Sequence, residues 1–161
     1  MGNRRRSREL AMQALFYMDI RKIASDAVLD SFCRAFGDSR DEDAFFTELV
    51  TGVLGSKADI DALIERFSSH WKISRMSCVD RNVMRIAVYE MLSRTDIPSK
   101  VSINEAIDVG KKYGTEESGA FINGILDSIH LAIESHEIQI PAATAGGESG
   151  NRDNLEKELA R

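Results

Sequence analysis

The chain has 161 residues, of which 43% are hydrophobic and 29% are charged. This is about one globular domain, and it excludes a wholly disordered or fibrous protein. No run approaches the roughly 18 consecutive apolar residues of a membrane span. Glu9, Gln13 and Asp19 interrupt the apolar stretch that a secretion signal would need, so we expect a cytoplasmic protein. Cys33 and Cys78 lack the spacing of a disulfide framework or a zinc site.

Charge is distributed unevenly along the chain, whose net charge is −5. Residues 1–8 hold four arginines and no acid, whereas residues 9–141 hold 14 basic and 22 acidic side chains. An acidic body repels nucleic acid, while a dense arginine cluster attracts phosphate. Any nucleic acid is therefore expected to bind at one place only.

Apolar residues recur at helical spacing, and no period-2 pattern typical of a strand extends over six residues. The pattern predicts an all-α protein of about seven helices. In chain order, the expected helices cover residues 5–20, 26–36, 39–54, 57–67, 79–93, 102–114 and 115–135.

Local signals predict where several of these helices begin and end. Ser39 with Glu42 and Ser102 with Glu105 have the spacing of capping boxes, which indicates a helix start at both places. Gly114 is expected to end the sixth helix as a C′ glycine. The other expected cap residues are Ser25 and Ser77.

The composition changes near the C-terminus, where small, polar and glycine residues replace apolar ones. Such a segment buries too little apolar surface to offset the entropy lost on ordering. We therefore expect one helical domain over residues 1–138 and a disordered tail over residues 139–161.

A search for catalytic motifs finds no HExxH, GxSxG, P-loop or GxGxxG pattern. His70, His130 and His136 are scattered and lack a paired nucleophile or orienting group, so we interpret them as structural or surface residues. The sequence thus predicts neither an enzyme nor a cofactor or metal site.

The remaining possible function is recognition of another molecule, and the arginines at 4, 5, 6 and 8 are the first candidates to contact nucleic acid. Guanidinium groups pair with phosphate and stack on bases, although a short basic end also simply aids solubility. The spacing of Phe121 favours core packing over stacking on an unpaired base.

Gly124 lies inside a helical pattern, where it costs about 1 kcal/mol relative to alanine, which indicates close packing by another helix.

Four segments together resemble the NusB family of bacterial transcription antitermination factors. They are RRRSRELAMQALF at 4–16, DRNVMRIAVYEM at 80–91, INEAIDVGKKYG at 103–114 and FINGILD at 121–127. The resemblance extends over residues 4–135 in the family's order and spacing.

The resemblance implies two packed helical subdomains without catalysis or cofactor. It also implies binding of the boxA element of ribosomal RNA leader transcripts as a heterodimer with NusE, a protein of the small ribosomal subunit. NusA, NusG and RNA polymerase would complete the antitermination complex.

Site residues follow from the resemblance by position. It implies RNA contacts at Arg4, Arg5, Arg6, Arg8, Phe16, Glu117 and Phe121. It implies partner contacts at Asp80, Arg81 and Arg85, which could pair with charges on NusE. Phe16 replaces a tyrosine of some members, so it keeps a stacking face but has no hydroxyl group.

Two other interpretations remain open. One is an RNA-binding accessory domain related to that of ribosomal RNA cytosine methyltransferases. The other is a protein adaptor, or a homodimer that masks its RNA face.

The RNA-binding interpretation predicts a dependence on salt. If about four phosphates are contacted, the logarithm of RNA affinity should fall with the logarithm of salt concentration with a slope near −3.

Overall fold

The structure is a computed structural model that describes residues 3–36, 44–69 and 71–138. These residues form seven α-helices and one short 3₁₀ helix, and no strand occurs among them. The predicted all-α fold is confirmed. The elements are α1 (Asn3–Arg21), α2 (Asp26–Phe36), α3 (Ala44–Gly55), α4 (Lys57–Phe67), η2 (Ile73–Arg75), α5 (Cys78–Ser93), α6 (Ser99–Tyr113) and α7 (Ser118–Glu134).

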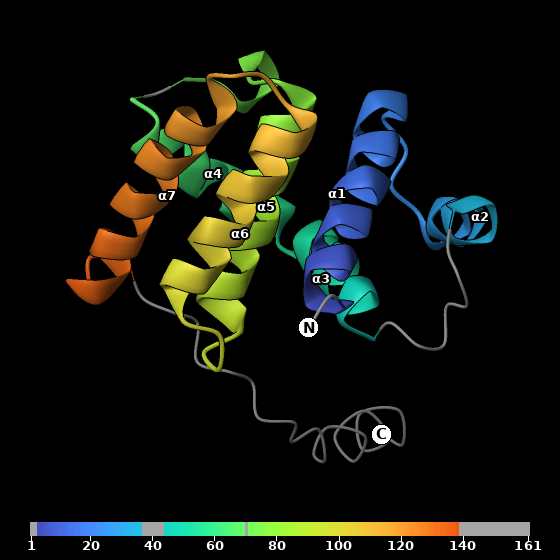
Figure 1. Cartoon of the computed structure of the whole chain (residues 1–161), viewed down its shortest axis with the longest axis horizontal. Helices are drawn as coiled ribbons and strands as arrows, with labels where there is room; N and C mark the ends of the chain where they lie inside the picture. Colours follow the sequence, from blue (N-terminus) through green and yellow to red (C-terminus); the bar gives the residue numbers. More distant parts are fainter. Residues whose placement is uncertain (1–2, 37–43, 70, 139–161) are drawn as a thin grey trace, which may run out of the picture.

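Helix α5 is the central element of the bundle and joins two groups of helices (Figure 1). One group comprises α1–α3, and the other comprises α4–α7. Helix α5 packs against α1 and α3 on one side and against α4, α6 and α7 on the other, so most of its side chains are buried. Within the described residues, no helix is both long and apolar enough to cross a membrane.

Two predicted N-caps are confirmed by their hydrogen bonds. The hydroxyl oxygen of Ser25 accepts from the backbone N–H of Val28 at 3.2 Å. The hydroxyl oxygen of Ser77 accepts from the backbone N–H of Asp80 at 3.1 Å. Each bond satisfies an N–H group that has no partner within its helix. Gly114 ends α6, and its N–H donates to the Gly110 carbonyl at 2.8 Å, but it is the C-cap residue with a φ of −96° and not the predicted C′ glycine.

The capping box expected at Ser102 and Glu105 is wrong. Helix α6 begins earlier, at Ser99, directly after Pro98. The carbonyl of Pro98 accepts from the N–H groups of residues 101 and 102, so Ser102 already lies inside the helix. A proline carbonyl starts the helix here without a serine cap. The side chains of Ser102 and Glu105 bond to other helices instead. The box expected at residues 39 and 42 lies outside the described residues.

The last helix begins at Ser118 rather than at Thr115. These two residues form a turn, in which the N–H of Thr115 donates to the Ser118 hydroxyl at 2.9 Å and the N–H of Ser118 donates to the Thr115 carbonyl at 3.1 Å. The acidic pair that follows Thr115 therefore precedes the helix, with Glu117 as its N-cap.

The contact expected at Gly124 is also wrong. A Cβ atom built there would have no heavy atom within 4 Å, because this side of α7 is exposed. The close approach occurs at Gly110 of α6, where a Cβ atom would lie 2.3 Å from Cδ1 of the buried Ile122. Helices α6 and α7 are thus able to pack closely because of Gly110.

Replacing Gly124 with alanine is expected to raise the free energy of unfolding by about 1 kcal/mol, the difference in helix propensity. Urea denaturation followed by circular dichroism measures it. Gly110→Ala gains the same propensity but overpacks the interface with Ile122, so its stability is expected to stay at or below that of the wild type. Equal gains at the two positions would contradict the role of Gly110.

Candidate nucleic-acid interface

The predicted arginine cluster occupies the first two turns of α1. Successive residues of an α-helix point about 100° apart, so the four side chains face different directions. Arg4, Arg5 and Arg6 are exposed, whereas Arg8 is 5% exposed. The cluster therefore presents three guanidinium groups on the surface and one in the core.

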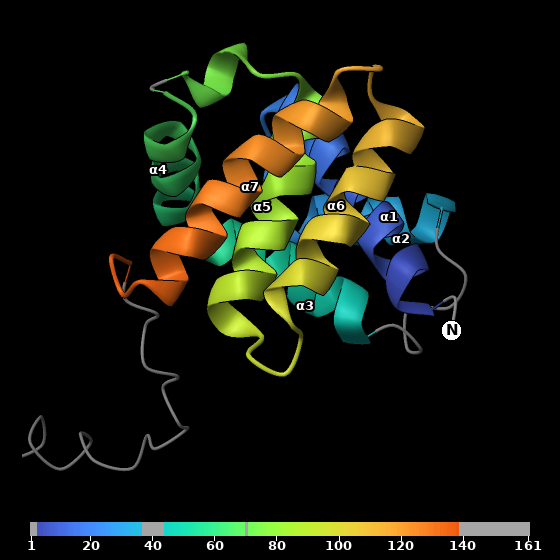
Figure 2. The ribbon, with the colours of Figure 1, turned by 60° about the vertical axis from the view of Figure 1, so that its left-hand side comes forward.

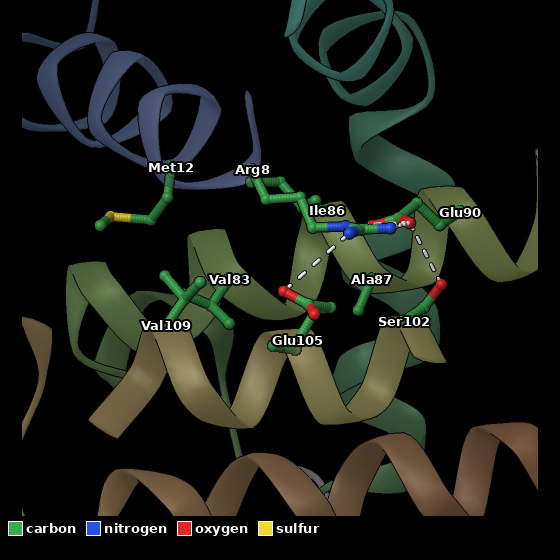
Figure 3. A pocket seen from close by; sticks show the side chains of 10 residues that line it. Arg8, Met12, Val83, Ile86, Ala87, Glu90, Ser102, Glu105 and Val109 are labelled. Carbon is green, nitrogen blue, oxygen red and sulfur yellow. Dashed lines mark hydrogen bonds and ion pairs between the residues drawn. The ribbon is translucent and has the colours of Figure 1, made fainter. Parts of the chain in front are cut away.

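Arg8 forms a buried ion pair with Glu90 of α5 (Figure 3). Its Nη2 donates to Oε1 of Glu90 at 2.6 Å, and its Nε donates to Oε2 at 3.0 Å. The hydroxyl of Ser102 on α6 donates to the same carboxylate at 3.2 Å. This corrects the expected phosphate contact of Arg8, because the side chain lies on the same face of α1 as Ala11 and Leu15, which pack in the core.

Arg5 is 52% exposed and joins α1 to α6. Its Nε donates to Oε2 of Glu105 at 2.9 Å, and its Nη2 donates to Oδ2 of Asp108 at 2.8 Å. The hydrogen bond to Glu105 raises the pKa of Arg5 above its ordinary value. Arg5 is accessible to a phosphate, but two carboxylates already balance its charge.

Arg4 belongs to a second group, which surrounds the ring of Phe45 on α3. The guanidinium carbons of Arg4, Arg8 and Arg94 lie 5.4, 5.3 and 5.4 Å from the ring centroid. Such cation–π contacts hold a guanidinium near an aromatic face. Arg94 also bonds to Glu48 at 2.6 Å. No local signal in the sequence indicates Phe45 and Arg94, because only the fold brings them to the start of α1.

Aromatic residues form the other predicted part of the interface, at the start of α7. The half-buried ring of Phe121 lies 6.3 Å from the ring of Trp71, with 59° between the planes. Trp71 is 57% exposed, and Glu117 is exposed one turn before Phe121. No sequence motif indicates Trp71, because its exposure depends on the fold.

The start of α1, which holds the arginine cluster, and the start of α7, which holds Phe121, lie at opposite ends of the bundle (Figure 1), and the α1–α6 contact connects them. Lys112 donates to Oε1 of Glu9 at 3.0 Å, and the hydroxyl of Tyr113 donates to Oε2 at 3.3 Å. The half-buried Phe16 lies further along α1. Polar and aromatic side chains thus extend along the α1–α6 contact, from the arginine cluster toward the start of α7.

The residues predicted to contact a partner belong to a network inside the chain. Arg81 donates from Nε to Oδ2 of Asp19 at 2.6 Å. Arg85 is 4% exposed, and it donates to Asp61 at 2.7 Å and to Asp19 at 3.0 Å. Carboxylates of this chain already balance the charges of both arginines. Arg85 is directed toward the interior, in contrast to the expected pairing with a partner.

Asp19 is the centre of this network. Burial opposes its ionisation, but hydrogen bonds from Arg81 and Asn82 and the charges of Arg81 and Arg85 outweigh burial. The pKa of Asp19 is therefore well below its ordinary value. At neutral pH the carboxylate is ionised, so it joins α1 firmly to α5.

Asp80, at the start of α5, differs from its two neighbours because its charge is not paired within the described part of the chain. The side chain is buried, and its Oδ1 atom accepts no hydrogen bond there. A buried oxygen without a donor is costly. Asp80 is the predicted partner residue that retains an unused acceptor.

The described residues contain no group of three histidine, cysteine, aspartate or glutamate side chains placed to hold a metal ion. A cavity of about 220 Å³ lies beside the Asp19 network, between α1, α3, α4 and α5. Its wall combines apolar side chains with Lys22 and Lys57.

Comparisons with known proteins identify the family. The model of the NusB family matches residues 5–131. The transcription antitermination protein NusB of Desulfatibacillum aliphaticivorans is 56% identical over 137 residues, covering 85% of this chain and 96% of that protein. The structure of T. maritima NusB is 38% identical, with a TM-score of 0.73, covering 84% of this chain and 97% of that one.

A further similar structure contains the antitermination factors NusB and NusE in complex with double-stranded RNA. It is 26% identical, with a TM-score of 0.73, and the match covers 82% of this chain and 98% of that one. The match of the family model over most of the chain, and the identity to curated members, establish that this chain belongs to the NusB family of transcription antitermination factors.

Proposed function

We propose that this chain binds the boxA element of ribosomal RNA leader transcripts together with NusE, and that the pair joins NusA, NusG and RNA polymerase in the cytoplasm. The observation that carries the proposal is the exposed arginine cluster at the start of α1 in an otherwise acidic chain. Membership of the NusB family and the similar complex of NusB, NusE and RNA support it.

In this proposal, Arg4, Arg5 and Arg6 contact phosphates, because their guanidinium groups are exposed. Phe16 and Phe121 supply stacking faces for unpaired bases, and Glu117 lies at the edge of that surface. Arg8 acts indirectly, since its buried pair with Glu90 fixes the start of α1 against α5.

NusE is proposed to dock near the start of α5. Arg81 supports this position because part of its side chain is exposed there, whereas the Oδ1 atom of Asp80 is buried. A basic partner on this acidic body would extend the positive surface. The heterodimer would then bind RNA more tightly than this chain does alone.

Fluorescence anisotropy tests the proposal with single-stranded boxA RNA and a scrambled strand, with and without NusE, over a range of salt concentrations. We expect preference for boxA and tighter binding with NusE. With three exposed arginines rather than four, the chain alone should show a salt slope of about −2. Absence of any sequence preference would favour the adaptor interpretation, and light scattering would then test for a homodimer.

The Arg4→Gln/Arg5→Gln double variant should bind boxA RNA more weakly and reduce the salt slope by about 1.4, since two phosphate contacts are lost. The matched control is Arg34→Gln/Lys57→Gln, which removes two exposed charges from α2 and α4. Equal losses in the two double variants would mean that net charge alone determines affinity. They would contradict a localised RNA surface.

A further inference from the structure

The cavity beside the Asp19 network takes no part in the proposed function. Its volume is about 220 Å³, and it is bordered by α1, the segment that follows α1, α3, α4 and α5. No described residue of α6 or α7 lines it. Figure 2 shows these two helices on the near side of the bundle, with α1 behind them. The cavity is therefore separate from the proposed RNA surface.

Part of the cavity wall is apolar. Its apolar side chains come from α1, the segment after α1 and α3, and they include Leu15, Met18, Ile23, Val53 and Leu54. An apolar group that covers this wall removes it from water, which is favourable. A ligand that fits the cavity therefore has an apolar part.

The polar groups that α1 and α5 contribute to the wall are already paired with one another. Nη1 of Arg85 donates to Oδ2 of Asp19 at 3.0 Å and to Oδ1 of Asn82 at 2.9 Å. Nδ2 of Asn82 donates to Oδ2 of Asp19 at 2.9 Å and to the Cys78 carbonyl at 2.8 Å. The amide of Asn82 has no further proton to donate, so these groups leave little capacity for a ligand.

Two lysines of the wall differ from this network because they are not paired. Lys22 and Lys57 are exposed, and neither has an ion pair within the described part of the chain. Arg81, Arg85 and Lys112, by contrast, bind carboxylates of this chain. Two cations without counter-ions at one cavity attract an anion.

The backbone at Lys22 supports a role for its side chain. Helix α1 ends in a Schellman motif, in which the N–H of Lys22 donates to the Asp19 carbonyl at 3.2 Å and the N–H of Ile23 donates to the Met18 carbonyl at 3.1 Å. Lys22 occupies the C′ position with a φ of 54°, where glycine is the usual residue because a side chain is strained there. A lysine at this position has a conformational cost, and such residues cluster at functional sites.

The start of α4 adds positive potential beside the cavity. Lys57 is the first residue of α4, and the side chain of Ser56 before it forms no capping bond. The first N–H groups of a helix have no partner within the helix, and the helix dipole is positive at this end. The charge of Lys57 and the end of the helix thus both favour an anion.

We infer that this cavity is a binding site for a small organic anion with an apolar tail, the chemistry of a medium-chain carboxylate. Lys22 and Lys57 bind the anionic group, and the tail packs against Met18 and Leu54. The volume is below the range of roughly 300–1,000 Å³ that is typical of drug-sized ligands, so the ligand is a small molecule. The inference does not depend on the proposed function, and its test requires no RNA.

The first experiment tests the chemistry of the ligand by isothermal titration calorimetry of the full chain with octanoate. We expect saturable binding with a Kd of about 1 mM or below. Octanamide has the same shape without the charge, and acetate has the charge without the tail. Each should bind at least about tenfold more weakly than octanoate. Octanoate binding no tighter than that of octanamide would overturn the inference, because the lysines would then contribute nothing.

The second experiment tests the two lysines. Lys22→Gly and Lys57→Gln should each weaken octanoate binding about tenfold, since each removes one charged donor. Without ligand, Lys22→Gly should have a Tm at or above that of the wild type, because glycine suits the backbone conformation at this position. The control Lys100→Gln removes one exposed charge on α6 and should leave the affinity unchanged. An equal loss in the control, or unchanged affinity in both cavity variants, would overturn the inference.

The third experiment locates the bound molecule by two-dimensional NMR of the backbone amides. Octanoate should shift the amide signals of residues 15–24 and 53–57, which border the cavity. The signals of α6 and α7 should remain in place. Shifts confined to the segments outside the cavity would show that octanoate binds elsewhere, and they would overturn the inference even if calorimetry shows binding.

Discussion

Replacing Glu90 with glutamine is expected to lower the free energy of unfolding by about 3–5 kcal/mol, a loss typical of a broken buried ion pair. Arg8 would then keep only the more distant carboxylate of Glu105, 4.0 Å away, because Glu90 is 1% exposed and water cannot take its place. Glutamine retains one acceptor oxygen for the two donating groups of Arg8. Urea denaturation followed by circular dichroism measures the change.

Two control variants separate the buried charge from other effects. Glu48→Gln breaks the more exposed pair with Arg94 and should cost less than about 1 kcal/mol. Arg8→Met combined with Glu90→Leu removes both charges and should recover most of the lost stability, because apolar side chains tolerate the site. A loss in Glu90→Gln no larger than that in Glu48→Gln would contradict the structural role of the Arg8–Glu90 pair.

The helices could be predicted from the sequence because their signals are local. The segments 26–36 and 57–67 were expected with the bounds that the structure has, and the caps at Ser25 and Ser77 make the expected bonds. The errors occurred where two local signals competed. Ser102 and Glu105 have capping-box spacing, but Pro98 starts the helix earlier, and both side chains then bond to distant residues.

The pairing of charges could not be predicted, since it depends on residues far apart in the sequence. Arg5 and Arg8 looked alike as members of one basic cluster, yet one is exposed and the other is in the core. Helical periodicity places Arg8 on the face of α1 that holds Ala11 and Leu15, so the sequence does contain a signal that Arg8 is buried. Its partner Glu90 lies 82 positions further along the chain, so no local pattern connects the two residues.

Asp19→Asn should lower the free energy of unfolding at neutral pH by about 3 kcal/mol, since Arg81 and Arg85 lose their shared carboxylate. The effect should depend on pH. The pKa of Asp19 is lowered in the folded state, so its contribution is fully present above the unfolded value of 3.8 and is lost as the pH falls toward the folded value. The stability difference from wild type should therefore shrink below about pH 4.

Urea denaturation at several pH values between about 2.5 and 7 measures this dependence. Asp59→Asn is the control, because Asp59 is exposed and has no ion pair within the described residues. Its effect should be small at every pH. A difference between Asp19→Asn and wild type that stays constant down to the lowest pH would show that packing, not charge, explains the loss. The lowered pKa predicts the opposite, because protonation in the unfolded state removes the advantage of the ionised carboxylate.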